Sequence, residues 1–264
     1  MKAWLKPHSS TSSPSTLVGR PWEIFRSTNI TPAHPHTIDL YSKNGGAYGY
    51  VSQISVTDQY GIGLVVLTAG DPGAQRIVYD TMLSVLLPAV EEEARAQAEA
   101  AYVGLWVGGE DDASVELNII MDDGPSLKLD SVTCNGSDIL AGYSEFFTAA
   151  LPQFGTLDPD MRIYPTSVVE GVTLNTSAGD VDVLREDWRI NLTFLPNTAE
   201  SSGSELPGQG AMQDYCSGWQ TADWVWYGGE GLDRIVFVRD ARSGEIVGVD
   251  FPALRSGLLE KRRL

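Results

Sequence analysis

The chain has few cysteine, histidine and basic residues, and each of these is abundant in some common class of proteins. It has 2 cysteines, 3 histidines and only 18 lysine and arginine residues against 35 aspartate and glutamate residues, for a formal net charge of -17. Such a chain repels phosphate backbones and anionic membrane surfaces, so we expect neither nucleic acid nor membrane as a partner. No apolar run approaches the roughly 20 residues that cross a bilayer. The hydrophobic content of 42% is nevertheless ample for a buried core.

The sequence contains few of the histidine and cysteine side chains that usually bind metals. His34 and His36 flank a proline, but no third ligand lies at a recognisable spacing, so we predict a solvated turn, no metal and no cofactor. The cysteines, Cys134 and Cys216, make one bridge or none, and the sequence leaves that choice open.

We also expect no export signal, because the first 20 residues have no apolar stretch of the signal-peptide kind. Four glycosylation triplets nevertheless occur, although Pro32 makes the first a poor acceptor and chance is an alternative explanation. They begin at Asn29, Asn135, Asn175 and Asn191. We expect a secreted ancestry with the signal absent from this chain.

The first hundred residues indicate strands followed by a helix. Residues 1–20 are polar and rich in Ser, Thr and Pro, which predicts a flexible segment. Alternating or continuous apolar residues then predict an antiparallel arrangement of strands, the last of them covered on both faces. Helical spacing follows, and Pro88 should kink or divide that helix. The expected strands are 21–27, 37–43, 47–56 and 60–69, and the expected helix is 73–102.

After Tyr102 the period changes to that of strands. Short β-patterned runs are separated by Asp-Gly, Asn-Gly and Ser-Gly turns, with a hairpin tip expected at residues 241–244. This pattern predicts an all-β segment, either a barrel or a sandwich. Residues 197–210 are expected to form a flexible insertion within it.

Lys43, Asn44, Gly45 and Gly46 are the candidate site. A Lys-x-Gly element on a strand that opens a meander, followed by two more strands and a long helix, resembles the end of the serine β-lactamase and penicillin-binding-protein fold. The resemblance implies that Lys43 binds a substrate carboxylate and that Asn44 replaces the usual threonine. It also implies that the glycines allow close approach of an acyl group, with Gly46 at the oxyanion-donor position.

The resemblance covers nearly the whole chain. The stretches "VGRPWEIFR", "IDLYSKNGGAYGY" and "LLPAVEEEARAQAEAAYVGLW" resemble the fungal secreted β-lactamase-like serine hydrolases that carry an extra C-terminal β-domain. "CNGSDIL", "LDRIVFV" and "VDFPALR" resemble that extra domain. The resemblance implies an α+β fold: a partial transpeptidase-like antiparallel sheet with its C-terminal helix at 21–101, and a β-rich domain at 102–264.

The nucleophile motifs of that family are absent. Neither Ser-x-x-Lys nor Tyr-x-Asn occurs, and Gly-x-Ser-x-Gly is missing as well. An oxyanion wall stabilises charge only after a nucleophile attacks. We therefore expect the C-terminal portion of a hydrolase for amides, esters or lactams, inactive alone. With part of the sheet missing, we also expect an exposed apolar strand and self-association.

A non-catalytic role for the β-domain, in ligand binding or structure, remains the alternative. Its sequence contains an aromatic cluster, which we interpret as core, with an apolar or sugar-binding surface as the other interpretation. The cluster consists of Trp219, Trp224, Trp226 and Tyr227.

Overall fold

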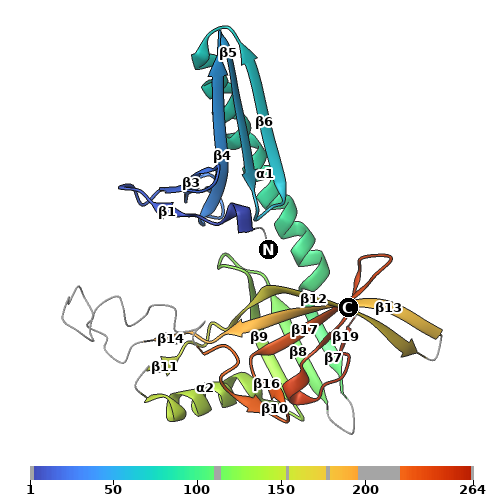
Figure 1. Cartoon of the computed structure of the whole chain (residues 1–264). Helices are drawn as coiled ribbons and strands as arrows, with labels where there is room; N and C mark the ends of the chain where they lie inside the picture. The colour runs from blue at the N-terminus through green and yellow to red at the C-terminus, as the bar shows by residue number, and fades with distance from the viewer. Residues whose placement is uncertain (1–2, 110–113, 153–154, 177–178, 196–220, 263–264) are drawn as a thin grey trace. The chain divides into compact units, whose positions relative to one another are not determined.

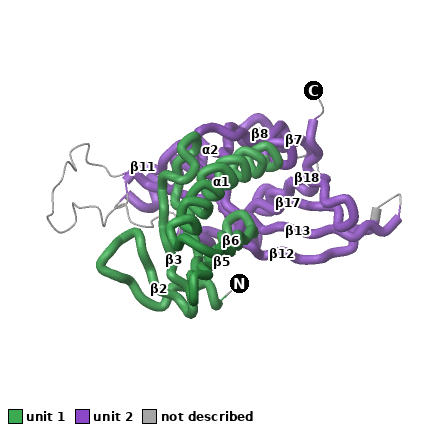
Figure 2. The backbone as a smooth tube through the Cα atoms, turned by 90° about the horizontal axis from the view of Figure 1, so that it is seen from above, with its two compact units in different colours: residues 1–98 green, residues 99–264 purple. Residues whose placement is uncertain are grey.

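The structure is a computed structural model that describes residues 3–109, 114–152, 155–176, 179–195 and 221–262 (Figure 1). By its contacts the chain divides into two compact units, residues 1–98 and 99–264 (Figure 2). We call them unit 1 and unit 2. The sequence placed this boundary near Tyr102, within the same long helix. The insertion expected at 197–210 lies outside the described residues.

Unit 1 is a six-stranded antiparallel sheet with a helix packed on one face. The strands follow one another in chain order, so each pairs with its neighbours along the sequence. Their bounds are β1 (Ser9–Ser10), β2 (Thr16–Val18), β3 (Glu23–Ser27), β4 (Ile38–Ala47), β5 (Tyr50–Thr57) and β6 (Ile62–Ala69), after a 3₁₀ turn η1 (Ala3–Leu5).

Residues 3–20 form short paired strands where a flexible segment was expected. β1 and β2 pair with each other, and β2 continues the sheet by pairing with β3. Leu5 is buried with Trp22 and Ile24, which anchors the segment. The sequence did not predict β1 and β2, because these strands are short and polar and only a few apolar side chains anchor them.

Helix α1 (Pro72–Tyr102) runs without a break through Pro88, so the proline does not divide it. A proline inside a helix removes one backbone hydrogen bond and costs about 3 kcal/mol. Leu87, together with Leu83, packs against Ile38 and Leu40 of β4, and this burial offsets the loss. The helix thus covers one face of the sheet.

In its described residues, unit 2 is a strongly curved antiparallel sheet with one α-helix of its own. The sheet order is β18-β17-β13-β12-β9-β8-β7-β19, with β10 paired to β9. Its main strands are β7 (Gly104–Gly108), β8 (Val115–Ile120), β9 (Leu127–Cys134), β12 (Arg162–Thr176), β13 (Gly179–Asn191), β17 (Arg234–Asp240) and β18 (Ile246–Asp250). The short elements are β10 (Ser137–Asp138), β11 (Thr156–Leu157), β14 (Phe194–Leu195), β15 (Trp226–Tyr227), β16 (Glu230–Gly231), η3 (Pro252–Leu254) and β19 (Glu260–Lys261).

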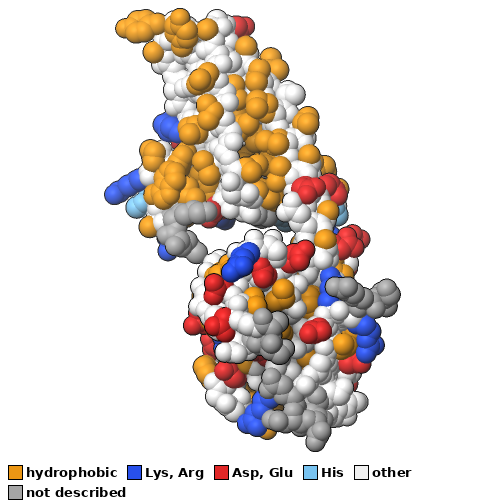
Figure 3. Space-filling view, turned by 90° about the vertical axis from the view of Figure 1, so that its right-hand side faces the viewer, with side chains coloured by type: hydrophobic (Ala, Val, Ile, Leu, Met, Phe, Trp, Pro, Cys, Tyr) orange, Lys and Arg blue, Asp and Glu red, His pale blue; other side chains and the backbone are white. Residues whose placement is uncertain are grey.

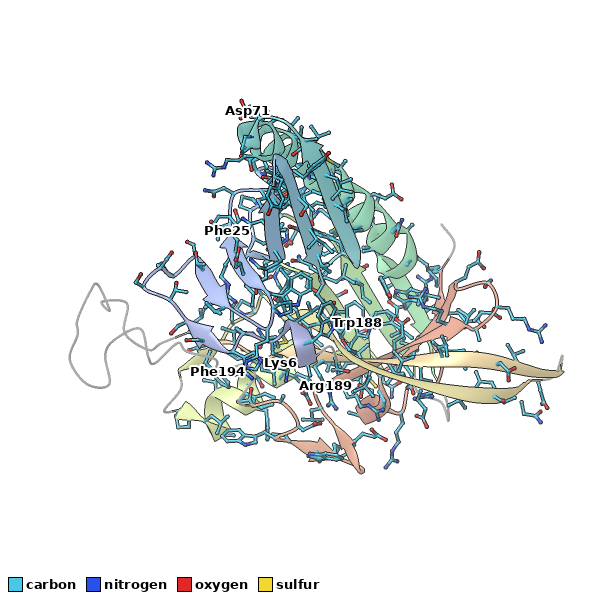
Figure 4. All side chains as sticks on the ribbon, turned by 45° about the horizontal axis from the view of Figure 1, so that its top comes forward. Lys6, Phe25, Asp71, Trp188, Arg189 and Phe194 are labelled. Atoms are coloured by element: carbon cyan, nitrogen blue, oxygen red, sulfur yellow. The ribbon has the colours of Figure 1, made fainter. Side chains whose placement is uncertain are left out.

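The two ends of this sheet come together, which makes it a nearly closed barrel rather than a sandwich. Val249 of β18 and Leu259, next to β19, exchange backbone hydrogen bonds of 3.1 and 2.8 Å. Phe237 and Trp106 lie in the core that this closure encloses. Figure 4 shows Trp188 beside Arg189 on β13, where alternation sends the indole to the core and the guanidinium towards Asp233.

The all-β expectation missed helix α2 (Ile139–Ala150). Asp138 caps it by accepting a hydrogen bond from the Ala141 amide, and Tyr143 and Phe147, four residues apart, are buried in the core. The Asn-Gly pair before it, at residues 135 and 136, was interpreted as a turn between strands. The hairpin tip expected at 241–244 is confirmed between β17 and β18.

Candidate functional site

Strand β4 holds the predicted site residues in the middle of the sheet, between β3 and β5. Lys43 is opposite Ile54, and Gly45 is opposite Ser52. Because side chains alternate along a strand, Lys43 and Gly45 face one side and Asn44 and Gly46 the other. Leu40, on the same side as Asn44, packs with α1. Lys43 and Gly45 therefore lie on the face opposite the helix, which we call the outer face.

Lys43 forms an ion pair in solvent. Its Nζ lies 2.6 Å from Oε1 of Glu23, and the two side chains are 43% and 58% exposed. Exposed pairs of this kind contribute about 0–1 kcal/mol, so the pair opens at little cost. An anionic ligand would compete with Glu23 for the ammonium group.

The glycines of the element are not required by the packing of unit 1. A Cβ added at Gly45 would lie 3.4 Å from Ser52 Oγ, and one added at Gly46 would lie 3.4 Å from the Tyr50 carbonyl oxygen. These are ordinary contacts, and neither glycine has the positive φ that excludes other residues. A ligand or another protein segment can therefore approach the backbone at Gly45 and Gly46.

A cluster of hydroxyl groups, which sequence analysis missed, lies on the opposite face. Ser42 Oγ and Ser55 Oγ are 2.5 Å apart, and Tyr79 OH of α1 is 3.2 Å and 2.5 Å from them. Within the described residues these hydroxyls bond only to one another, and a serine nucleophile needs a neighbouring base. Ser42 and Asn44 also form a Ser-x-Asn triplet, but both point away from Lys43. The cluster therefore joins the sheet to the helix.

A pocket of about 470 Å³ lies beside this cluster, on the helix side of β3 and β4. Its walls include Phe25, Leu40, Leu83, Ser42 and Tyr79, and Phe25 is labelled in Figure 4. The volume is in the range of small-molecule sites. Lys43 and Gly45 do not line it. Glu23, the ion-pair partner of Lys43, does line it, so the pocket adjoins the predicted site through this carboxylate.

Unit 2 contains a polar cluster that is structural. Arg162, 9% exposed, donates to Asp122 at 2.8 Å and to Asp160 at 2.7 Å, and Lys128 also pairs with Asp160. Hydrogen bonding from Arg162 lowers the pKa of Asp122 to about 2. The buried guanidinium is fully paired, and such pairing satisfies a charge that would otherwise destabilise the barrel.

Three of the four aromatic residues expected in the core are exposed. Trp224, Trp226 and Tyr227 are 53%, 59% and 63% exposed, whereas Trp219 lies outside the described residues. Val225 packs against the core instead, so the residues on either side of it point outwards. Gly228 and Gly229, both with positive φ, then make the tight turn between β15 and β16.

The remaining sequence predictions map to scattered positions. His36 lies 3.8 Å from Glu91, and His34 lies 3.4 Å from Glu92. The described part of the chain contains no group of three or more metal-binding side chains, and none of its helices meets the length and hydropathy of a membrane span.

Cys134 is half-buried, and Cys216 lies outside the described residues. Of the glycosylation triplets, Asn29, Asn135 and Asn175 are exposed and Asn191 is partly buried.

Comparison with known proteins identifies relatives over both units. A family model described as "Beta-lactamase-like-like, C-terminal domain" matches residues 94–262. The chain is 46% identical to a "Beta-lactamase-like protein" of Arthroderma benhamiae, over 98% of this chain and 44% of the relative. It is 26% identical to a "Probable hydrolase" of Cochliobolus lunatus, over 93% of this chain and 38% of that relative. The chain spans less than half the length of these fungal proteins, and no solved structure matches it.

Proposed function

Because the chain belongs to the β-lactamase-like family, we propose that it is the C-terminal portion of a serine hydrolase for amides, esters or lactams. In this proposal the segment Lys43–Gly46 forms one wall of the active site. Lys43 binds the carboxylate of an acyl substrate, and the amide of Gly46 stands at the oxyanion position.

The observation that carries the proposal is the placement of Lys43 and Gly45 on one open face of β4. The lysine is held by a single exposed carboxylate, and the neighbouring glycine leaves room that unit 1 does not use. A cation beside an accessible strand is suited to an anionic substrate that lies along the backbone. The names of the relatives, a β-lactamase-like protein and a probable hydrolase, agree with such chemistry.

The chain alone lacks the remaining part of this chemistry. Its sequence has no Ser-x-x-Lys, and the serine that lies nearest to Lys43 in the chain, Ser42, is hydrogen-bonded to hydroxyls on the other face. Donors aimed at an oxyanion act on charge that a nucleophile creates. We therefore propose that the nucleophile belongs to the additional length seen in the relatives, and that the chain by itself is inactive.

Turnover of nitrocefin and of a nitrophenyl ester tests this proposal. We expect the purified chain to show no turnover above a heat-treated control. We expect activity when the chain replaces the matching segment of the Arthroderma benhamiae relative, and its loss in Lys43→Ala of that chimera. Lys128→Ala, which removes an equally charged lysine from unit 2, is the matched control. Activity of the isolated chain that disappears in Lys43→Ala would contradict the proposal.

A second candidate function is ligand binding by the barrel without catalysis. Trp224 and Trp226 are large exposed rings on a unit that has a complete core of its own, and indoles stack well on sugars or apolar ligands. Retention of the chain on insoluble polysaccharide, lost in Trp226→Ala, would favour this function. Retention that is unchanged by that substitution would count against it.

A further inference from the structure

The pocket on the helix side of β3 and β4 has an apolar floor. Leu40 of β4 and Leu83 of α1 line it, and both belong to the small core cluster around Leu87. Phe25, opposite Leu40 across the two strands, adds a ring that is 48% exposed (Figure 4). The volume of about 470 Å³ is that of a site for an organic molecule rather than for a single ion. The pocket therefore offers apolar contact to a ligand with an aromatic or aliphatic body.

The charged groups that line this pocket are all negative. Glu23 of β3 and Asp80 of α1 line it, and the lining residues that the structure describes include no Lys, Arg or His. Lys43 donates to Oε1 of Glu23, whereas Oε2 of the same carboxylate accepts no hydrogen bond within the described residues. An apolar pocket with two carboxylates and no cationic lining residue favours a positively charged ligand.

The hydroxyl cluster supplies further acceptors to the same pocket. Ser42 and Tyr79 line it, and their hydroxyl groups bond to each other and to Ser55. A hydroxyl oxygen has two lone pairs, so an oxygen that accepts one hydrogen bond within the cluster can accept another from a ligand. The cluster also joins β4 and β5 to α1, which fixes the positions of these acceptors before a ligand arrives.

We propose that this pocket binds a small organic amine. The apolar body of the amine lies against Phe25 and Leu83, and its ammonium group is bound by the carboxylates of Glu23 and Asp80. An ammonium group donates up to three hydrogen bonds, and those to carboxylates are the strongest that it forms. The net charge of -17 attracts a cation to the chain and repels an anion. The site is separate from the anion-binding role proposed for Lys43.

Glu23 links the pocket to Lys43. The carboxylate is shared, because it lines the pocket and also lies 2.6 Å from the lysine Nζ. An ammonium group bound to Glu23 weakens its attraction for Lys43, and an anion bound to Lys43 leaves Glu23 free for the amine. By linkage, each ligand raises the affinity of the chain for the other. This coupling rests on the proposed function, whereas binding of the amine does not.

Titration calorimetry of the full chain with 2-phenylethylamine at pH 7 tests the proposal. The matched ligand is 2-phenylethanol, which has the same ring and length but no charge. Hydrophobic side chains also gather elsewhere over unit 1, as Figure 3 shows, so an aromatic ring alone can bind outside the pocket. The difference between the two ligands reports the carboxylates. We expect the amine to bind about tenfold more tightly than the alcohol.

Glu23→Gln combined with Asp80→Asn should remove this preference. We expect the affinity for the amine to fall about tenfold and that for the alcohol to stay unchanged. Asp39→Asn is the matched control, because Asp39 is a carboxylate of the same sheet that pairs with Arg26 but does not line the pocket. Equal binding of the two ligands, amine binding that survives in the double variant, or a tenfold loss in Asp39→Asn would overturn the proposal. Far-UV circular dichroism verifies that the variants fold.

Phenylacetate tests the link to Lys43. Its presence should raise the affinity for the amine about twofold, because the exposed ion pair that both ligands replace is weak. The same anion should have no effect in Lys43→Ala. An affinity for the amine that phenylacetate leaves unchanged in the unaltered chain would overturn the coupling.

The chimera with the Arthroderma benhamiae relative separates amine binding from catalysis. The relative is more than twice as long as the segment that this chain matches, so its additional length is the competing occupant of the pocket. We expect the chimera to bind 2-phenylethylamine as the chain alone does. If the chain binds the amine and the chimera does not, the additional length fills the pocket and the proposal is overturned. If the chimera binds the amine but turns over neither nitrocefin nor the ester, the pocket stands and the proposed function fails.

Discussion

Unit 1 and unit 2 are both antiparallel sheets with a helix, but only unit 2 encloses its core. In unit 2 the strand order returns on itself through Val249 and Leu259, and one continuous cluster of buried side chains fills the interior. In unit 1 the sheet stays open, and its buried residues form two small clusters around Trp22 and Leu87. Closure removes edges and lets apolar side chains of every strand share one interior.

The two units also differ in how far they bury the apolar side chains of their strands. Val65 and Leu67 of unit 1 are exposed, whereas Ile235 and Phe237, on a comparable strand of unit 2, are fully buried. Strand β6 was expected to be covered on both faces, and the structure covers only one. The apolar composition is that of a doubly buried strand, but in the described residues Val65 and Leu67 of the outer face stay exposed. Unit 2 therefore buries its apolar strands around one interior, and unit 1 leaves apolar side chains exposed on one face of its sheet.

The largest expected effect is a difference in stability between the two units. We expect two unfolding transitions in urea, with unit 1 unfolding first. Phe237→Ala should shift only the second transition, by about 3–5 kcal/mol, because the ring is buried against Tyr102, Trp106 and Trp188. Far-UV circular dichroism measures both transitions.

Phe25→Ala is the control for this prediction, since that phenylalanine of unit 1 is 48% exposed. It should leave the second transition where it is. A single transition, or an equal effect of Phe237→Ala on both, would show that the units fold as one and that unit 1 is not the weaker part.

A smaller effect concerns pH and unit 2 alone. Arg162 lowers the pKa of Asp122 to about 2, below the usual value near 3.8. A lowered folded-state pKa stabilises the protein above pH 4, and this contribution is lost as the pH falls from about 4 to 2. The Asp122 side chain is 36% exposed, so solvent screening reduces the contribution to about 1 kcal/mol.

Asp122→Asn should therefore lower the stability of the second transition at pH 7 by about 1 kcal/mol and have progressively less effect towards pH 3. Urea unfolding at several pH values measures this. Asp123→Asn, at the exposed neighbouring position, is the matched control. An effect of Asp122→Asn that is constant with pH would rule out the ion pair as its cause.

Much of unit 1 was predictable because its signals are local. Residues 38–47, 50–57 and 62–69 alternate or are continuously apolar, and the helical spacing after Gly73 is long. Asp58 and Gln59 lie between two of these strands, as expected. Polar β1 and β2 were missed, since their pairing depends on β3 and not on their own composition.

The parts that could not be predicted depend on distant contacts. The bond from Tyr79 to Ser42 and Ser55 joins residues far apart in the sequence, and no motif marks it. The sequence also did not distinguish a barrel from a sandwich, because closure of the sheet depends on the backbone pairing of Val249 with Leu259. The roles of Lys43 and Gly46 stay predictions, since they concern a ligand rather than the fold.

The smallest expected effect on stability, with a clear effect on binding, comes from the outer face. The exposed side chains of Ile54, Val65 and Leu67 on the outer face of unit 1 should bind Nile red, a neutral dye that the net charge of -17 does not repel. Substituting threonine for Val65 and Leu67 together preserves β propensity, removes apolar surface and should reduce dye fluorescence markedly. Both side chains are already exposed, so stability should change by no more than about 0.5 kcal/mol. The same pair of substitutions at Val168 and Val169, which are 59% and 55% exposed on unit 2, should leave dye binding unaltered. Dye uptake that persists in the first double variant would place the apolar surface elsewhere and would remove the contrast between an open unit and a closed one.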